Sequence, residues 1–437
     1  MRKISLFILA LFVVLGACNK NNIQQQPAPS AMQQQQQQVG APNQYANTNN
    51  IAGSRGGNTG LGSSTSTTVT PVDPTKVPRA KRDANAGRIV QVALLLDTSN
   101  SMDGLIDQAK SQLWKMVNEL SLARDSKGEI PQIELALYEY GNDGLSAENG
   151  YIRQISPLTT DLDLISEKLF ALSTNGGSEY CGYVINDAAQ ILDWQTNNEE
   201  LKLIIIAGNE EYTQGPVNYK EACKKAISKG IVINTIFCGN WNEGVRTQWK
   251  DGADCADGKY LNIDQDRKVV HIEAPQDSEI NRLNNQLNDT YIGYGQEGIN
   301  KKERQMMQDA NAASYSTANA AQRAISKASK AYKNDDWDIV DAYKEKRVDI
   351  KAIAKDELPN EMKNMTGEQR EQFVKQKMDT RTQLQDHIAK LSEERRQYVA
   401  AKEREIAAQN PEANTLDAVM LKAIREQAAK KGFIFKL

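Results

Sequence analysis

The chain has few of the residues and motifs on which catalysis or nucleic-acid binding usually depends. Only two histidines occur among 437 residues, and there is no Cys-x-x-Cys pair, which argues against a structural zinc site. The 53 Lys and Arg residues nearly balance the 56 Asp and Glu residues, so the charge gives no reason to expect a nucleic-acid partner. No glycine-rich nucleotide-binding loop follows the first apolar strand, and no Gly-x-Ser-x-Gly element occurs. The sequence therefore predicts a protein that is not an enzyme.

The chain begins with a short apolar run that ends at a cysteine. The run from Ile4 to Leu15 follows two basic residues and is too short to span a bilayer as a helix. Small residues then precede Cys18, and this arrangement resembles the lipobox of bacterial lipoproteins. The resemblance implies a signal peptide over residues 1–18 and acylation of Cys18, which would anchor the protein to a membrane. The alternative is an ordinary signal peptide with a chance cysteine. Asn19 is not the aspartate associated with inner-membrane retention, so we expect the bacterial cell envelope, with the outer membrane favoured.

Residues 19–87 contain very few apolar side chains. A run of glutamines at 33–38 is followed by a stretch rich in Asn, Gly, Ser and Thr. Such a segment cannot bury enough surface to fold, so we predict a disordered tether between the anchor and the first folded domain.

From residue 88 the pattern changes to apolar strands that alternate with helices. Near-continuous apolar runs are typical of strands buried on both faces of a sheet. The alternation predicts an α/β domain over residues 88–297, with a doubly wound, mostly parallel, Rossmann-like sheet. The expected strands are 89–96, 132–140, 151–157, 201–206, 231–237, 259–263 and 268–272, and the expected helices are 103–122, 162–172, 183–194, 219–228 and 278–291.

Residues 298–437 are rich in Ala, Lys, Glu, Gln and Arg and nearly lack glycine. Helices are expected at 305–332 and 337–355, and Thr366-x-x-Gln369 is a capping box that should open a helix running to about residue 409. A narrow apolar stripe along that helix suits either a helical hairpin or a coiled coil, and the imperfect heptads favour the hairpin. We therefore predict an all-α C-terminal module, which would allow self-association.

The sequence places a group of oxygen ligands where the first buried strand ends. Open α/β sheets bind their ligands at this edge. In the run Asp97-x-Ser99-x-Ser101, one carboxylate and two hydroxyls suit a small hard dication. The run resembles the DxSxS signature of the metal-ion-dependent adhesion site in von Willebrand factor type A domains. The resemblance implies that fold for residues 88–297, and a metal site to which Ser178 contributes where the family has a threonine.

The resemblance implies Mg²⁺ as the preferred metal, with Mn²⁺ or Ca²⁺ as substitutes. The family's last ligand, an aspartate, falls on Gly208, so the site is degenerate. Asn209 and Glu210 do not match the pattern but are the neighbouring residues that could reach the metal instead. We expect Gly208→Asp to strengthen metal binding. The alternative is a metal-free relic in which Asp97 holds a turn and Ser101 or Asp103 caps the next helix.

Four cysteines remain besides Cys18, and an even number in an oxidising compartment predicts disulfides among Cys181, Cys223, Cys238 and Cys255. Cys238 ends a strand and Cys255 follows in the next connection, so this pair is the first expectation. Other connectivities stay open.

By resemblance, the first functional hypothesis is an interaction or adhesion lipoprotein whose protein partner offers a carboxylate to the metal. The second is a metal-independent envelope scaffold that assembles through the C-terminal helices. Partner capture that disappears with EDTA favours the first hypothesis.

Overall fold

The computed structural model describes residues 87–263, 271–409 and 416–435. Cys18, almost all of the expected tether and most of the expected strand at 268–272 therefore lie outside the described residues. Within the described residues, no helix is both long enough and apolar enough to cross a membrane.

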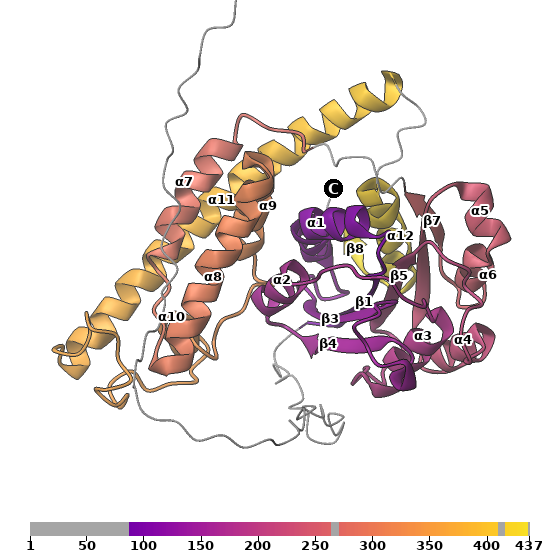
Figure 1. Ribbon diagram of the computed structural model, residues 1–437. Coiled ribbons are helices and arrows are strands. Elements are labelled where there is room, and N and C mark those ends of the chain that lie inside the picture. The colour runs from indigo at the N-terminus through magenta and orange to yellow at the C-terminus, as the bar shows by residue number, and fades with distance from the viewer. Residues whose placement is uncertain (1–86, 264–270, 410–415, 436–437) are drawn as a thin grey trace, which may run out of the picture. The chain divides into compact units, whose positions relative to one another are not determined.

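Six strands form one sheet in the order β4-β3-β1-β5-β6-β7 (Figure 1). Strand β1 runs parallel to β3 and β5, β6 runs parallel to β5 and β7, and β4 pairs antiparallel with β3. This confirms the predicted mostly parallel sheet, of which β4 is the antiparallel edge. The strands are β1 (Ile89–Asp97), β3 (Gln132–Tyr140), β4 (Ile152–Thr159), β5 (Leu201–Gly208), β6 (Val232–Cys238) and β7 (Tyr260–Ile263).

Helices cover both faces of the sheet, because alternate side chains of each strand point to opposite faces. On β1, Val90 and Val92 pack with α1, α2, α7 and α12 in one apolar core. The neighbouring Ala93 and Leu95 pack with α3, α4 and α6 in a second core on the other face. These helices are α1 (Asp103–Ser121), α2 (Leu162–Phe170), α3 (Cys181–Ile191), α4 (Tyr219–Ser228), α6 (Trp249–Asp254), α7 (Asp277–Asn288) and α12 (Leu416–Lys430), and a short α5 (Trp241–Arg246) precedes α6.

A helical region follows the sheet and consists of α7, α8 (Gly295–Tyr315), α9 (Thr317–Ala328), α10 (Ile339–Lys344), α11 (Gly367–Gln409) and α12. The predicted capping box is confirmed: the Gln369 side chain accepts a hydrogen bond from the Thr366 N–H at 2.8 Å, and the Thr366 hydroxyl accepts one from the Gln369 N–H at 3.3 Å. The resulting helix of 43 residues is about 65 Å long.

Two expected helices differ from the structure. The expected helix at 305–332 is divided between α8 and α9 by Ser316, whose backbone is extended and whose hydroxyl accepts from the Asn319 N–H at 3.0 Å. That hydroxyl caps α9, which is the role a serine favours over a mid-helix position. The expected helix at 337–355 is reduced to the six residues of α10.

The helical region is packed onto the α/β part and is not a separate hairpin. Helix α9 contacts α1, α8 contacts α2, and α12 contacts both α1 and β7. After α12, strand β8 (Ile434–Phe435) pairs with β2 (Ala123–Arg124). The predicted boundary at residue 298 therefore does not separate two independent units, because the last described residues complete the cover of the sheet.

Candidate metal centre

Asp97 is the last residue of β1 and lies beside Tyr140, the last residue of β3. Its side chain is fully buried. The Oδ1 atom accepts a hydrogen bond from the Ser99 N–H at 2.7 Å, which fixes the turn after the strand. Within the described residues the Oδ2 atom is buried and has no hydrogen-bond partner. A buried carboxyl oxygen without a partner is costly, so something outside the chain is expected to satisfy it.

The two serines of the predicted run lie at different depths. Ser99 is buried, and its Oγ makes no hydrogen bond of ordinary geometry within the described residues, but it lies close enough to lower the pKa of Asp97. Ser101 is exposed, and its Oγ accepts from Nδ2 of Asn209 at 3.2 Å. Neither serine caps α1, whose first turn has no side-chain cap. The alternative in which Ser101 serves as a helix cap is therefore wrong.

The loop over residues 173–179 is held against the same edge. The Asn175 N–H donates to the Thr98 carbonyl at 2.9 Å, and the Asp143 N–H donates to the Gly176 carbonyl. Gly177 allows a close backbone approach, since a Cβ there would collide with the carbonyl of Gly141.

This loop brings Ser178 to the rim of the site, partly buried. Within the described residues, however, no hydrogen bond joins Ser178 to Asp97, Ser99 or Ser101. The role of Ser178 as a ligand stays a prediction.

Glu179, which the sequence analysis did not single out, lies beside Asp97. Both Asp97 Oδ1 and Glu179 Cγ are 2.8 Å from the position that a Cβ on Gly141 would take, so the two side chains are neighbours. Burial raises the pKa of Asp97 to about 8, and the charges of Glu179 and Glu210 add to this effect. Burial also raises the pKa of Glu179 to about 7, with a further contribution from Glu210. The edge thus gathers acidic groups whose charge the protein itself does not compensate.

Tyr140 occupies the space that an aspartate at position 208 would need. Its hydroxyl donates to the Ala207 carbonyl at 2.9 Å. A Cβ added to Gly208 would lie 2.5 Å from this hydroxyl and 2.9 Å from Asp97 Oδ2. A real Cβ does not approach other atoms this closely, so Gly208→Asp would push the side chains of Tyr140 and Asp97 out of their positions. The expectation that this change strengthens metal binding does not fit the structure.

The donor set suits a hard divalent cation. It offers the unpartnered Asp97 Oδ2, the hydroxyls of Ser99 and Ser101, and a second buried carboxyl on Glu179. Oxygen ligands of this kind bind Mg²⁺, Mn²⁺ and Ca²⁺. The described residues contain no cluster of three or more His, Cys, Asp and Glu side chains arranged to hold a metal, so such a site would depend on the hydroxyls as well.

The disulfide differs from the first expectation. Cys223 of α4 is bonded to Cys255, while Cys181 and Cys238 are free and buried. Cys238 packs in the core on the α1 face of the sheet, whereas Cys223 and Cys255 pack on the α3 face. The sheet therefore separates Cys238 from Cys255.

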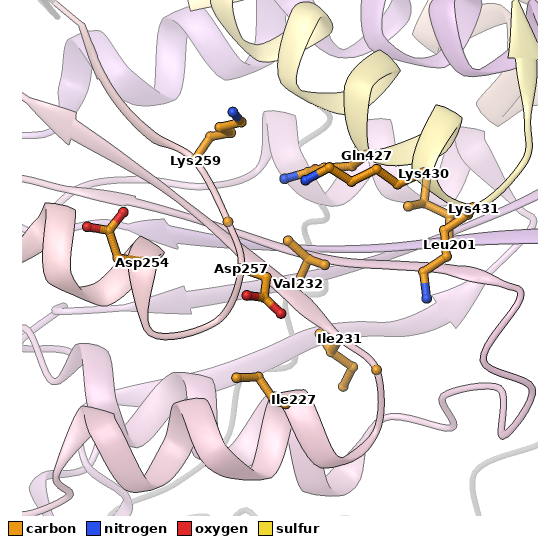
Figure 2. Close-up of a pocket in the computed structure, with 12 residues that line it drawn as sticks. Leu201, Ile227, Ile231, Val232, Asp254, Asp257, Lys259, Gln427, Lys430 and Lys431 are labelled. Atoms are coloured by element: carbon orange, nitrogen blue, oxygen red, sulfur yellow. The ribbon is translucent and has the colours of Figure 1, made fainter.

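A cavity of about 470 Å³ lies at the other end of the strands, and Figure 2 shows the residues that line it. Leu201 and Val232, the first residues of β5 and β6, line it together with Gln427 and Lys430 of α12. Because these strands are parallel to β1, their first residues lie at the edge opposite Asp97. The cavity is not part of the candidate metal centre.

Comparisons with known proteins locate one family in the chain. The comparison with curated proteins found no match. Among solved structures, the conserved hypothetical protein BatB from Bacteroides thetaiotaomicron is 19% identical with a TM-score of 0.31, over 40% of this chain and 90% of that one. An aerotolerance-related membrane protein from Bacteroides fragilis is 18% identical with a TM-score of 0.28, over 40% and 92%. The proximal thread matrix protein 1 of the mussel byssus, with zinc in its metal-ion-dependent adhesion site (MIDAS) motif, is 14% identical with a TM-score of 0.30, over 41% of this chain and 43% of that one. Residues 91–254 match the family model of the von Willebrand factor type A domain.

Proposed function

We propose that this protein is a lipid-anchored envelope protein that binds other proteins through the carboxyl edge of its von Willebrand A domain, with a divalent cation as part of the binding face. Domains of this type generally serve interaction or adhesion. The observation that carries the proposal is Asp97, a fully buried carboxyl group whose Oδ2 atom has no partner among the described residues. A cation at this edge would satisfy that atom.

The chain's own residues prepare the site for such a cation. The Ser99 N–H orients the Asp97 carboxyl group, and Asn209 orients the Ser101 hydroxyl. Asp97, Ser99 and Ser101 would hold the ion, with Ser178 as the further ligand that the family pattern implies. A bound dication supplies positive charge and an open coordination position, which suits a carboxylate offered by a partner protein.

The proposal is tested by calorimetric titration of the full chain with Mg²⁺ and with Mn²⁺. We expect the natural chain to bind either metal, and Asp97→Ala to abolish binding while the circular dichroism spectrum stays unchanged. Glu243→Ala is the matched control. Glu243 is an exposed acidic residue on α5 that pairs with Arg246 and does not belong to the candidate metal centre, so its loss should leave metal binding unchanged. Absence of binding by the natural chain at millimolar metal would show that the metal-dependent mechanism is wrong.

The membrane anchor is a separate part of the proposal. Cys18→Ser should abolish incorporation of a labelled fatty acid and leave the precursor unattached, because the thiol that would carry the lipid is lost. Equal labelling of this variant and the natural chain would refute lipidation. Fatty-acid labelling measures lipidation alone, so its result does not depend on whether the domain binds a metal.

A second candidate function, metal-independent assembly, is favoured by the surface of α8. Ile299, Met306 and Met307 are 47%, 53% and 60% exposed and fall within one arc of about 100° on the helix. Three large apolar side chains on one exposed helical face suit self-association. Sedimentation velocity of the full chain with and without EDTA tests this: oligomers that persist in EDTA and disappear in Met306→Lys/Met307→Lys support the scaffold function, and a monomer at all concentrations excludes it.

A further inference from the structure

The candidate metal centre is closed on one side and acidic on the other. On the side of β5, the Tyr140 hydroxyl fills the space next to Gly208, so no side chain from that position can reach a cation. On the side of the 173–179 loop, Glu179 lies against Asp97. The chain thus lacks an acidic ligand where the family pattern has one and has an acidic residue in a different place.

We propose that Glu179 supplies the second carboxylate of the metal centre, in place of the ligand that Gly208 cannot provide. The inference rests on the proposed function, since it assigns one more ligand to the same cation. It is carried by two observations. The side chains of Asp97 and Glu179 are neighbours on the Oδ1 side of the Asp97 carboxyl group, and the Asp97 Oδ2 atom, which faces Gly208, is buried without a partner among the described residues.

Glu179 suits this role better than the two residues that compete for it. Ser178 offers a neutral hydroxyl, which adds no charge to balance a dication. The Glu210 side chain is exposed, whereas Glu179 is 6% exposed and its Cγ atom lies beside the Asp97 carboxyl group. Glu179 is therefore directed into the site and Glu210 lies at its rim.

Close packing of the loop holds Glu179 there. The Glu179 N–H donates to the Gln214 side chain at 3.3 Å, and the loop's contacts with Thr98 and Gly141 place it on the ends of β1 and β3. Two carboxylates balance the charge of a dication, so we expect the full chain to bind its cation without help from a partner protein.

The test is a calorimetric titration of the full chain with Mn²⁺, comparing the natural sequence with Glu179→Gln and Glu210→Gln. If Glu179 is a direct ligand, Glu179→Gln weakens binding at least tenfold, whereas Glu210→Gln, which removes only a nearby charge, weakens it no more than about threefold. Glu179→Asp keeps the charge but shortens the side chain, and its affinity should lie between those of the natural chain and Glu179→Gln.

The outcomes separate this inference from the proposed function. If the natural chain binds Mn²⁺ and Glu179→Gln binds it equally well, or if Glu210→Gln shows the same loss, Glu179 is not a ligand and the Asp97 site stands. If the natural chain does not bind Mn²⁺, both ideas fail. Thermal unfolding in EDTA excludes a trivial loss of fold: we expect Glu179→Gln to unfold at or above the natural temperature, because it removes repulsion with Asp97. If Glu179→Gln unfolds at a lower temperature than the natural chain, Glu179 and Asp97 do not repel each other in the folded state and the inference is contradicted.

Discussion

Replacing Arg323 by methionine should destabilise the protein by about 3–5 kcal/mol, because it breaks a buried ion pair and leaves an acidic partner uncompensated. Arg323 belongs to α9, and its side chain is fully buried. Its guanidinium lies 2.6 Å from Asp163 of α2 and 3.0 Å from Asp309 of α8. It also stacks 4.2 Å above the ring centre of Trp114 in α1. One side chain therefore links the helical region to two helices of the α/β domain.

The magnitude follows from what the substitution leaves behind. Asp309 keeps its ion pair with Lys327 at 2.7 Å, but Asp163, 6% exposed, keeps only a hydrogen bond from Tyr332 among the contacts described. The unpaired carboxylate is thus the main penalty. Arg246→Met provides the control: the side chains of Arg246 and its partner Glu243 are 69% and 52% exposed, so neither partner is left buried and the pair should contribute at most about 1 kcal/mol.

Urea denaturation of the full chain measures both effects, with tryptophan fluorescence and circular dichroism as separate probes. We expect one transition for both probes, shifted to lower urea in Arg323→Met and almost unmoved in Arg246→Met. Asp163→Asn added to Arg323→Met should recover part of the loss, because it removes the uncompensated charge. Equal effects of the two arginine substitutions would refute the reasoning, as would a transition of the helical region that is independent of the sheet.

Three further changes test the site and its surroundings. Cys223→Ala combined with Cys255→Ala should lower the free energy of unfolding by about 3.5 kcal/mol, since the disulfide closes a loop of 32 residues, and unchanged thermal unfolding would contradict this. Gly208→Asp should destabilise by about 1–3 kcal/mol through its clash with the Tyr140 hydroxyl, and Tyr140→Phe should recover part of that loss in the same assay; no recovery would place the clash elsewhere. In EDTA, Asp97 alone should lower the free energy of unfolding by up to about 1.4 kcal/mol per pH unit between pH 5 and 8, because burial raises its pKa to about 8 and the folded state keeps a proton that the unfolded chain has released. Urea titrations at several pH values measure this slope, and Asp97→Asn should reduce it.

The sheet was predictable because strands buried on both faces need apolar residues at nearly every position. The run at 89–96 has this character, and in the structure β1 is flanked by β3 and β5 and covered on both faces. The long helix α11 was predictable for a local reason, since Thr366 and Gln369 cap it within four residues. Signals that act within one strand or one turn can be read directly from sequence.

The position of α12 was not predictable in this way. Its buried residues Leu421, Ile424 and Ala428 predict a helix with one covered face, but they do not name the surface that covers it. That surface belongs to β7 and α1, which lie more than 150 and 290 residues earlier in the chain. Long-range packing of this kind leaves no local pattern, so the sequence suggested a separate module.

The disulfide could have been assigned from the phase of a strand. In β6, Phe237 packs on the α3 face and the next residue, Cys238, packs on the α1 face. Cys255 follows α6, which covers the α3 face of the sheet. Because side chains alternate between the two faces along β6, Cys238 points to the face opposite Cys255. Proximity in sequence favoured Cys238, but the period of two along a strand decides the matter.

The candidate metal centre combines a family pattern with substitutions that only the structure relates to one another. Taken alone, Gly208 suggests a site that has lost a ligand. In the structure, however, the position is not an empty space, because the Tyr140 hydroxyl excludes even a Cβ there, and a second acidic residue, Glu179, lies on the opposite side of Asp97. For folding alone, an asparagine at position 97 would avoid burying a carboxyl group with an unpartnered oxygen next to another acid. A divalent cation accounts for both carboxyl groups at once, so the absence of an aspartate at position 208 is not an argument against metal binding by this domain.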